Sequence, residues 1–376
     1  MEPLRKLARL SASHGALRPG NGLASGVVAL GLAILCFLGV LAFHFPQYLT
    51  TPQLRQAYSV ELLRGVMFAA LVIAGAISLF NILRDRSRWL AFASFLLIAA
   101  TLALGGHAVP VNDFADGMPY IGLDWFILDL LGSTLIFVFI EKLFPLRRDQ
   151  PVFRPEWQTD FQHFMVNHMA VGFVLLAVNL LVHRLFGWAA QDGVRAWVQA
   201  LPFPLALLAI VLVADLVQYA VHRAYHEVPL LWRLHAVHHS VKSMDWLAGS
   251  RQHILEVIIT RTLVLGPIFV LGFSKPVIDA YILIVGFQAV FNHANVSVRL
   301  GPLRYLIVTP NFHHWHHAQD EEAIDKNYAA HFAFIDHLFG TAVKSDRDWP
   351  ERYGVLGDYV PDGFWRQLLF PLRWKG

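Results

Sequence analysis

Long apolar runs alternate with short polar connections along this chain. A helix needs roughly 20 mostly apolar residues to cross the hydrocarbon core of a bilayer, and eight runs approach or exceed that length. These runs are about 24–44, 65–83, 89–107, 119–141, 164–186, 201–221, 254–273 and 277–293. The pattern predicts an all-α fold, a polytopic helical bundle built from about eight apolar segments.

The composition supports this interpretation. Of 376 residues, 56% are hydrophobic and 15% are charged, whereas a soluble domain carries about 25% charged residues. The single cysteine, Cys36, lies inside the first apolar run. It excludes an intramolecular disulfide framework and any metal site with several cysteines. The net charge is +3, and the excess basic residues lie between the apolar runs, so membrane topology explains them without a nucleic-acid partner.

Charge alternates between successive connections. The connections 84–88 and 142–154 are rich in Arg and Lys, whereas 108–118 carries Asp113 and Asp116 and no basic residue. Basic connections face the cytoplasm in most membrane proteins. We therefore expect the N-terminus and both basic connections in the cytoplasm. Eight crossings bring the C-terminal half back to that side.

Chemistry-bearing residues are unevenly distributed. Residues 1–150 contain membrane spans without a ligand cluster, 155–345 contain the candidate chemistry, and 346–376 form a tail that we expect on the membrane surface. The last two apolar runs, 254–293, contain Gly266, Pro267 and Gly272. They form either two full spans or a shallow hairpin, and the sequence leaves both open.

Histidines gather in the second half of the chain. Residues 222–317 hold eleven of the nineteen histidines, mostly in HRAYH (222–226), HAVHH (235–239) and HHWHH (313–317). Neutral imidazole is the commonest metal ligand in proteins. The expected arrangement is therefore a histidine-rich metal-binding cap at the cytoplasmic ends of the helices.

The spacing selects the candidate ligands. Side chains three or four residues apart share one face of a helix, and the first cluster has the i, i+4 spacing while the other two have i, i+3 and i+4. A further histidine, His293, ends the last apolar run, beside Asn292 and Asn295. The candidate ligands are His222, His226, His235, His238, His239, His293, His313, His316 and His317. Nine imidazoles exceed the needs of one metal ion, so we predict two, and iron, copper and zinc all suit imidazole.

Polar residues beside these ligands are candidate catalytic residues. Asp215 and Tyr219 share a helix face with His222, and Asn295 follows the candidate ligand near the last run. An ionisable residue within a membrane span is a functional candidate by default. We expect Asp215 to orient an imidazole rather than to bind a metal. The remaining histidines of the region, His253, His314 and His331, are expected to have supporting or structural roles.

In these motifs the chain resembles the fatty acid hydroxylase superfamily, also called the sterol desaturase family. The resemblance covers about 155–345, and includes a spaced histidine pair, two HxxHH boxes, the FNHAN segment and the ending NYAAHFAFIDHLFGT (327–341). Two positions depart from the family pattern, because Ala329 stands where Gly is common and Ile335 where Trp is common. Neither position is a candidate ligand.

The resemblance implies an integral-membrane, non-haem di-iron enzyme. Its histidines would hold two iron ions, for which zinc is a conceivable substitute, and it would use O2 on a C–H bond of a lipid. The implied partners are a membrane lipid and an external electron donor, either a ferredoxin or a cytochrome b5-like protein with its reductase. The lipid class stays open among sterols, fatty acyl chains, sphingoid bases, ether lipids and carotenoids. Hydroxylation, desaturation and ether cleavage also stay open.

The main alternative is a membrane metal-ion transporter or a metal-binding protein. Transporters place their sites near the bilayer midplane, whereas these histidines lie mostly outside the apolar runs. A zinc protease would need HExxH, and no histidine stands at the fourth position after His226 and Glu227. The pattern therefore favours the oxygenase.

Overall fold

The computed structural model describes residues 23–55, 59–84, 86–111, 120–298, 300–343, 345 and 348–373. Its ordered elements are helices, and within this part of the chain the extended pairing is limited to two isolated bridges. The predicted all-α fold is thus confirmed. The chain forms two compact units, Met1–Ile127 with Met169–Gly172, and Leu128–His168 with Phe173–Gly376. Asp113 and Asp116 lie outside the described residues.

The first unit is built around three long helices that pack on one another, α2, α5 and α6. Its helices are α2 (Leu23–His44), α3 (Pro46–Leu49), α4 (Pro52–Arg55), α5 (Val60–Leu83), α6 (Arg88–Ala103) and η1 (Gly106–Ala108). Small residues such as Ala33 and Ala74 are fully buried where the helices meet, which lets the backbones approach closely. None of the candidate ligands lies in this unit.

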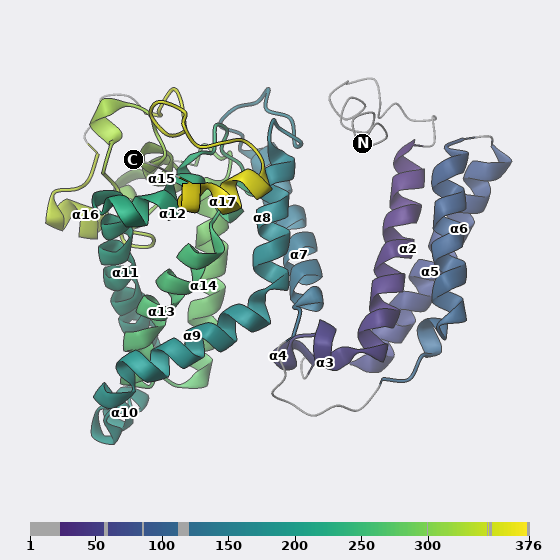
Figure 1. Ribbon diagram of the computed structural model, residues 1–376, viewed down its shortest axis with the longest axis horizontal. Coiled ribbons are helices and arrows are strands. Elements are labelled where there is room, and N and C mark those ends of the chain that lie inside the picture. Colours follow the sequence, from purple (N-terminus) through teal and green to yellow (C-terminus); the bar gives the residue numbers. More distant parts are fainter. Residues whose placement is uncertain are drawn as a thin grey trace. The chain divides into compact units, whose positions relative to one another are not determined.

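The second unit holds the histidine clusters. Its helices are α7 (Leu123–Leu143, which begins in the first unit), α8 (Trp157–Met169), α9 (Val171–Phe186), η2 (Gly187–Ala189), α10 (Asp192–Gln199), α11 (Phe203–Glu227), α12 (Pro229–His239), η3 (Ala248–Ser250), α13 (Ile254–Leu271), α14 (Lys275–His293), η4 (Gly301–Tyr305), α15 (Pro310–His316), η5 (Glu321–Ala323), α16 (Ala333–Phe339) and α17 (Phe364–Arg373). The helices α11, α13 and α14 stand side by side, and α12, α15, α16 and α17 lie near one end of them (Figure 1).

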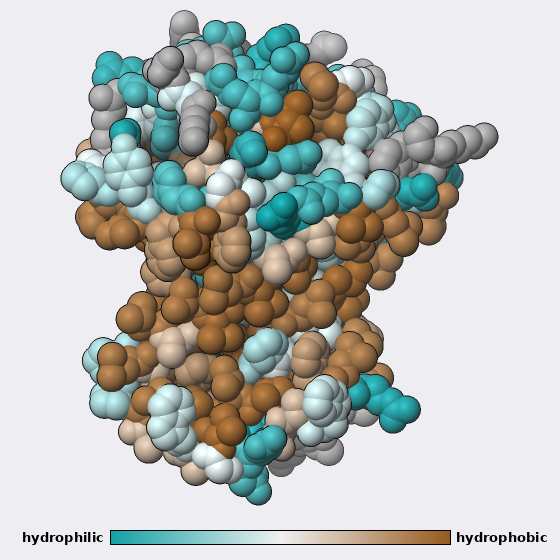
Figure 2. All heavy atoms as spheres, turned by 90° about the vertical axis from the view of Figure 1, so that its left-hand side faces the viewer, coloured by the Kyte–Doolittle hydropathy of each residue, from teal (hydrophilic) through white to brown (hydrophobic). Residues whose placement is uncertain are grey.

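Eight of the described helices are long and apolar enough to cross a membrane, as the sequence predicted. The fifth predicted run, 164–186, is wrong as a single helix, because the chain turns at Ala170 between α8 and α9. The reason is chemical: α8 is a mostly polar helix whose buried Asp160 forms ion pairs, so only α9 is suited to lipid. Figure 2 shows a hydrophobic band on one face of the molecule, below a more hydrophilic upper part.

Helix α11 is the centre of the second unit. Its buried residues Ile210 and Ala214 pack in one apolar cluster with Val264 of α13 and with Val277 and Tyr281 of α14. Both α13 and α14 therefore pack against α11. The same helix continues beyond this cluster and carries two histidines in its last turns.

Proline and a side-chain cap define where the box-bearing helices begin. Helix α12 begins at Pro229 and α15 at Pro310, and proline suits the first turn because its missing N–H would be unpaired there. The Thr309 hydroxyl also accepts a hydrogen bond from the Phe312 N–H. These starts place each histidine box in the final turns of a short helix.

Candidate metal centre

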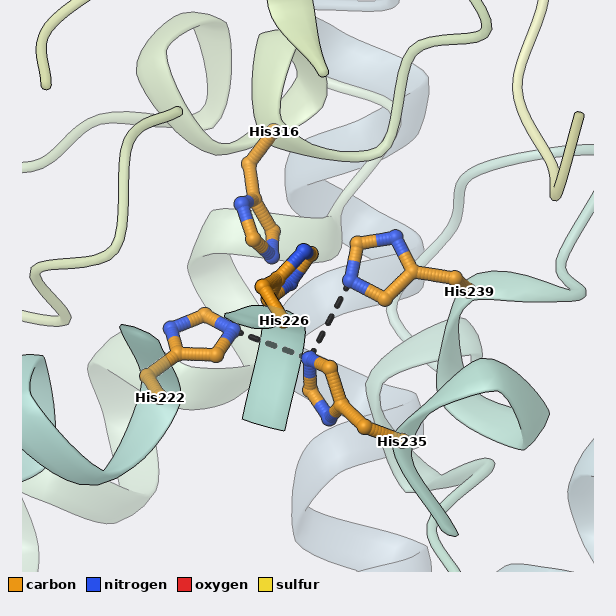
Figure 3. A group of neighbouring side chains, drawn as sticks. All are labelled: His222, His226, His235, His239 and His316. Carbon is orange, nitrogen blue, oxygen red and sulfur yellow. Dashed lines mark hydrogen bonds between the residues drawn. The ribbon is translucent and has the colours of Figure 1, made fainter. Parts of the chain in front are cut away.

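The nine candidate ligands converge into two neighbouring groups. In each group the potential ligand atoms lie within 4.8 Å of one another. The first histidine group consists of His222, His226, His235, His239 and His316, whose rings point toward a common centre in Figure 3. The second histidine group consists of His238, His293, His313 and His317. The structure therefore brings together every ligand candidate chosen from the sequence.

Each HxxHH box contributes to both groups. On α12, His235 and His239 lie one turn apart and face the first group, while His238 between them faces the second. In the other box, His316 belongs to the first group, and His313 and His317 belong to the second. The two groups adjoin, because the rings of His239 and His317 stack with their centroids 4.4 Å apart. Each box thus supplies ligands to both candidate metal positions.

Hydrogen bonds fix the imidazole tautomers of the first group. The Nδ1 atom of His222 lies 2.7 Å from the carbonyl oxygen of Tyr328, and Nδ1 of His316 lies 2.7 Å from that of Lys326. A carbonyl oxygen only accepts hydrogen bonds, so both Nδ1 atoms carry the proton. The Nε2 atoms are left with a free lone pair, as a metal ligand requires.

The second group uses the same device. Nδ1 of His238 donates to the carbonyl oxygen of Arg251 at 3.2 Å, and Nδ1 of His293 donates to that of Ala289 at 2.8 Å. The Nε2 atoms of these two histidines face each other at 3.3 Å. Two lone pairs therefore meet at this distance.

The same conflict appears in the first group. Nδ1 of His235 lies 2.8 Å from a buried carboxyl oxygen of Glu256, and its Nε2 lies 3.0 Å from Nε2 of His222. With Glu256 ionised, the carboxylate accepts the Nδ1 proton and both Nε2 atoms carry lone pairs. Protonation does not relieve the repulsion, because burial holds the pKa of His235 well below its usual value. The buried Nε2 atoms of His226 and His316 have no hydrogen-bond partner. A cation among these lone pairs would satisfy all of them, so the residues fit a metal ion.

Glu256 is a site residue that the sequence reasoning missed. Its side chain is buried, and one oxygen holds the His235 proton. The carboxylate lies in the first turn of α13, at the start of an apolar run. An acidic residue at a span end was the available signal, but its distance of 21 residues from the histidine hid the contact.

Asp325 is a second residue that was missed. Its carboxylate lies 3.1 Å from Nδ1 of His226, and the residue adopts a positive φ of 55°. The left-handed conformation is more accessible to Asp than to most other residues. This contact fixes the His226 tautomer in the way that carbonyl oxygens do elsewhere in the centre.

Asp215 does not make the expected contact with an imidazole. It is fully buried, and its oxygens accept the backbone N–H groups of Ala330, His331 and Phe332. The physical reason is depth, because Asp215 lies seven residues before His222 on α11, about 10 Å along the helix. The carboxylate instead fixes the backbone of the segment that follows Tyr328.

Tyr219 and Asn295 are also engaged away from the rings. The Tyr219 hydroxyl lies 3.0 Å from the hydroxyl of Thr341. The Asn295 side chain exchanges two hydrogen bonds with the backbone of Arg147, at 2.9 and 3.1 Å. Among the described residues, neither polar group bonds to a member of the two histidine groups. Both residues position chain segments next to the centre.

The other histidines of the region lie outside both groups. His314 is fully buried between the Tyr353 hydroxyl and the Ala294 carbonyl oxygen. His253 caps α13 by accepting from a backbone N–H. The ring of His331 bonds to the Gln288 side chain at 2.6 Å.

A buried ion-pair network supports the second group. Arg154 contacts Asp160 at 2.7 Å and Asp245 at 2.8 Å, and Arg251 pairs with the same Asp160 and with Glu156. The two arginines are 1% exposed, so these charges need the pairing to be tolerated. The carbonyl oxygen of Arg251 accepts the Nδ1 proton of His238. By holding Arg251 in place, the network therefore helps to orient the His238 ring.

The two departures from the family pattern fit this fold. Asp336 accepts the N–H groups of Tyr328 and Ala329 and the Thr341 hydroxyl, which folds the 327–341 segment on itself. Ala329 is buried and is not among the residues with positive φ, so glycine is not required there. Ile335 is fully buried in an apolar cluster and supplies hydrophobic contact.

Comparison with known proteins gives a consistent result. Residues 207–341 match the fatty acid hydroxylase family model, and this range includes all nine candidate ligands and Glu256. Ornithine lipid hydroxylase OlsE of Rhizobium tropici is 27% identical over 299 residues, 78% of this chain and 88% of that protein. Alkylglycerol monooxygenase of Homo sapiens is 32% identical over 130 residues, 34% of this chain and 28% of that protein.

A putative methylsterol monooxygenase of Dictyostelium discoideum is 26% identical over 204 residues, 52% of this chain and 72% of that protein. The chain thus spans most of the ornithine lipid hydroxylase but less than a third of the human monooxygenase. No solved structure gives a significant match. The match to the family model, the relatives and the two histidine groups inside the matched range identify residues 207–341 as a fatty acid hydroxylase domain.

Proposed function

We propose that this protein is a membrane oxygenase that uses O2 and external electrons to hydroxylate a C–H bond of a lipid at a two-metal centre. The observation that carries the proposal is the pair of buried groups in which imidazole lone pairs converge at 3.0 to 3.3 Å. Relatives named as lipid hydroxylases and monooxygenases support the reaction class.

The proposed metal is iron, with one ion in each histidine group. Imidazole also suits zinc and copper, and iron is the metal implied by the family that the histidine motifs resemble. Bound iron would supply the activation of O2 and the redox chemistry that side chains lack. Zinc in its place would occupy the ligands without that chemistry, because it has no redox activity.

The protein's own residues orient the ligands and exclude water. Carbonyl oxygens and the Glu256 carboxylate hold protons on Nδ1, so each corresponding Nε2 is directed at the centre. Burial lowers the pKa of His238 and His316 well below the usual value, which keeps these ligands neutral at physiological pH. Such supporting contacts are worth about 10- to 100-fold in metal affinity or activity.

An apolar groove beside α14 supports a lipid substrate. It has a volume of about 420 Å³ and is lined by side chains that include Leu283, Phe287 and Phe291. Residues Ile307 and Val308 form another part of its wall. Because α14 ends at a ligand of the second group and α15 begins just after Val308, the groove leads toward that group.

The proposed sidedness places the histidine groups at the cytoplasmic face. The basic connections 84–88 and 142–154 support this orientation, since basic loops stay on the cytoplasmic side. A ferredoxin, or a cytochrome b5-like protein with its reductase, would then deliver electrons from that side. The 346–376 tail is proposed to lie on the membrane surface, in keeping with its exposed Trp365 and Leu372.

The test combines metal analysis with isotope labelling. Protein purified in nanodiscs should contain about two iron ions per chain, and with a reductant and labelled O2 it should transfer one labelled oxygen atom to a lipid of the host extract. A protein of the alternative class would move metal ions across proteoliposomes without oxidising lipid. Full activity with zinc alone, or lipid oxidation without label, would overturn the proposal.

A further inference from the structure

Arg261 lies in the middle of a candidate membrane span. Helix α13 covers Ile254–Leu271, so Arg261 stands seven residues after its start (261 − 254) and ten before its end (271 − 261). A charged side chain at this depth is costly unless it faces an interior, a cavity or a partner. Its placement in a mostly apolar helix calls for a specific partner.

The protein supplies no such partner among its described residues. The Arg261 side chain is exposed, and it makes no ion pair or hydrogen bond within the described part of the chain. Three other arginines of the second unit have partners. Arg154 and Arg251 pair with carboxylates, and Arg195 donates to a backbone carbonyl at the far end of α13. Arg261 is thus left available to a ligand.

The polar groups nearest to Arg261 sharpen this interpretation. Tyr281 of α14 is close enough to interact electrostatically with the guanidinium, and its hydroxyl makes no hydrogen bond within the described residues. Asp215 also interacts with Tyr281, but its oxygens are occupied by three backbone N–H groups. Neither Arg261 nor the Tyr281 hydroxyl therefore has an acceptor among the described residues.

We propose that Arg261, with the Tyr281 hydroxyl, binds the anionic group of the lipid substrate, a phosphate or a carboxylate. This inference rests on the proposed lipid oxidation. Guanidinium binds both groups through two parallel hydrogen bonds. The anion comes from a membrane lipid, because a site at mid-span is reached laterally from the bilayer.

The position of Arg261 also sets the distance to the attacked carbon. Glu256 precedes it by five residues, about 7.5 Å along the helix, and Glu256 lies 2.8 Å from His235 of the first histidine group. Along the helix axis, the bound anion therefore lies about 7.5 Å from the level of Glu256. The substrate is an anionic lipid whose oxidised carbon is at least about that far from the anionic group, which disfavours sterols and carotenoids because they carry no such group.

Binding measurements test the site without turnover. Protein in detergent is titrated with short-chain phosphatidic acid, with the matched diacylglycerol that lacks the phosphate, and with inorganic phosphate, and bound lipid is read by native mass spectrometry. The wild type should bind phosphatidic acid about 10-fold or more tightly than diacylglycerol, and inorganic phosphate should not compete. The Arg261→Gln variant should lose this preference, and Arg261→Lys should keep part of it.

Lys275→Gln is the matched control, because Lys275 is exposed and lies at the opposite end of α14 from the histidines. It should leave the preference intact, and all variants should retain wild-type metal content. A wild-type preference in Arg261→Gln would overturn the site, as would equal competition by inorganic phosphate. Lipid oxidation that survives Arg261→Gln unchanged would reject the anchor while leaving the proposed function standing. If Arg261→Gln loses the preference for phosphatidic acid but the wild type oxidises no lipid, the proposed function alone would be rejected.

Discussion

The Nε2 atoms of His238 and His293 lie 3.3 Å apart although neither nitrogen carries a proton. Each ring donates its Nδ1 proton to a backbone carbonyl oxygen on its other side, His238 to that of Arg251 and His293 to that of Ala289. In an apolar interior, two facing lone pairs raise the free energy of the fold. The arrangement is understandable if the fold has been selected with a cation between these rings.

Because each HxxHH box serves both groups, single substitutions should empty the two metal positions separately. His316→Ala removes a ligand of the first group, and His238→Ala removes one of the second. Elemental analysis should show a fall from about two metal ions per chain toward one in each variant, with activity abolished. The same loss of activity is expected for His239→Ala and His317→Ala.

These variants should still insert, because insertion depends on the apolar spans. The control is His183→Ala, since His183 is exposed and belongs to neither group. His14→Ala is a second control, at a position outside the described residues. Near-normal activity in any two of the four box variants would refute the ligand assignment.

The spacing of the boxes was enough to predict the ligands, because i, i+3 and i+4 positions share a helix face. The division into two groups was not visible in the sequence. It depends on the approach of the two boxes in space, which places His238 with His313 although 75 residues separate them (313 − 238). Likewise, the contacts of Glu256 and Asp325 are made through space and leave no local pattern.

The lengths of the apolar runs predicted the membrane spans well. The prediction failed at 164–186, where an apolar stretch belongs to a helix whose other residues are polar. The 164–169 stretch reads as the start of a span, yet Asp160 and His163 of the same helix are buried in polar contacts. The helix therefore ends at Met169. For Asp215, helix periodicity gave the correct face but not the partner, because the backbone of 330–332 reaches it from a distant part of the chain.

Glu256→Gln should weaken metal binding without unfolding the protein. Glutamine keeps the shape and an acceptor oxygen for the His235 N–H, but it removes the charge that makes the imidazole a stronger ligand. We expect a loss of roughly 10- to 100-fold in metal affinity or activity. Competitive chelator titration measures the affinity, and Glu256→Ala should be worse than Glu256→Gln. Equal affinity in wild type and Glu256→Ala would show that this carboxylate does not support the site.

Asp215→Asn should affect stability more than chemistry. The carboxylate holds the N–H groups of Ala330, His331 and Phe332, and an asparagine amide replaces one acceptor oxygen with a donor. A backbone N–H left unpaired costs about 1–3 kcal/mol. Thermal unfolding in detergent should occur at a lower temperature, and metal per folded chain should change little. A loss of metal at unchanged stability would restore a direct role for Asp215 at the centre.

Sidedness can be tested by cysteine accessibility. Asp320 lies just after the second box, and position 114 lies in the acidic connection outside the described residues. In a Cys36→Ala background, Phe114→Cys should react with an impermeant thiol reagent in intact cells, whereas Asp320→Cys should react only after lysis. The reason is the Arg and Lys bias of the short connections, which keeps 84–88 and 142–154 in the cytoplasm. Cys36 itself is 2% exposed within the first unit, so its removal takes away the background thiol without changing a connection.

Labelling of Asp320→Cys from outside would mean an odd number of crossings before α15. The electron donor would then have to approach from the opposite side of the membrane, and the cytoplasmic ferredoxin or cytochrome would be the wrong partner.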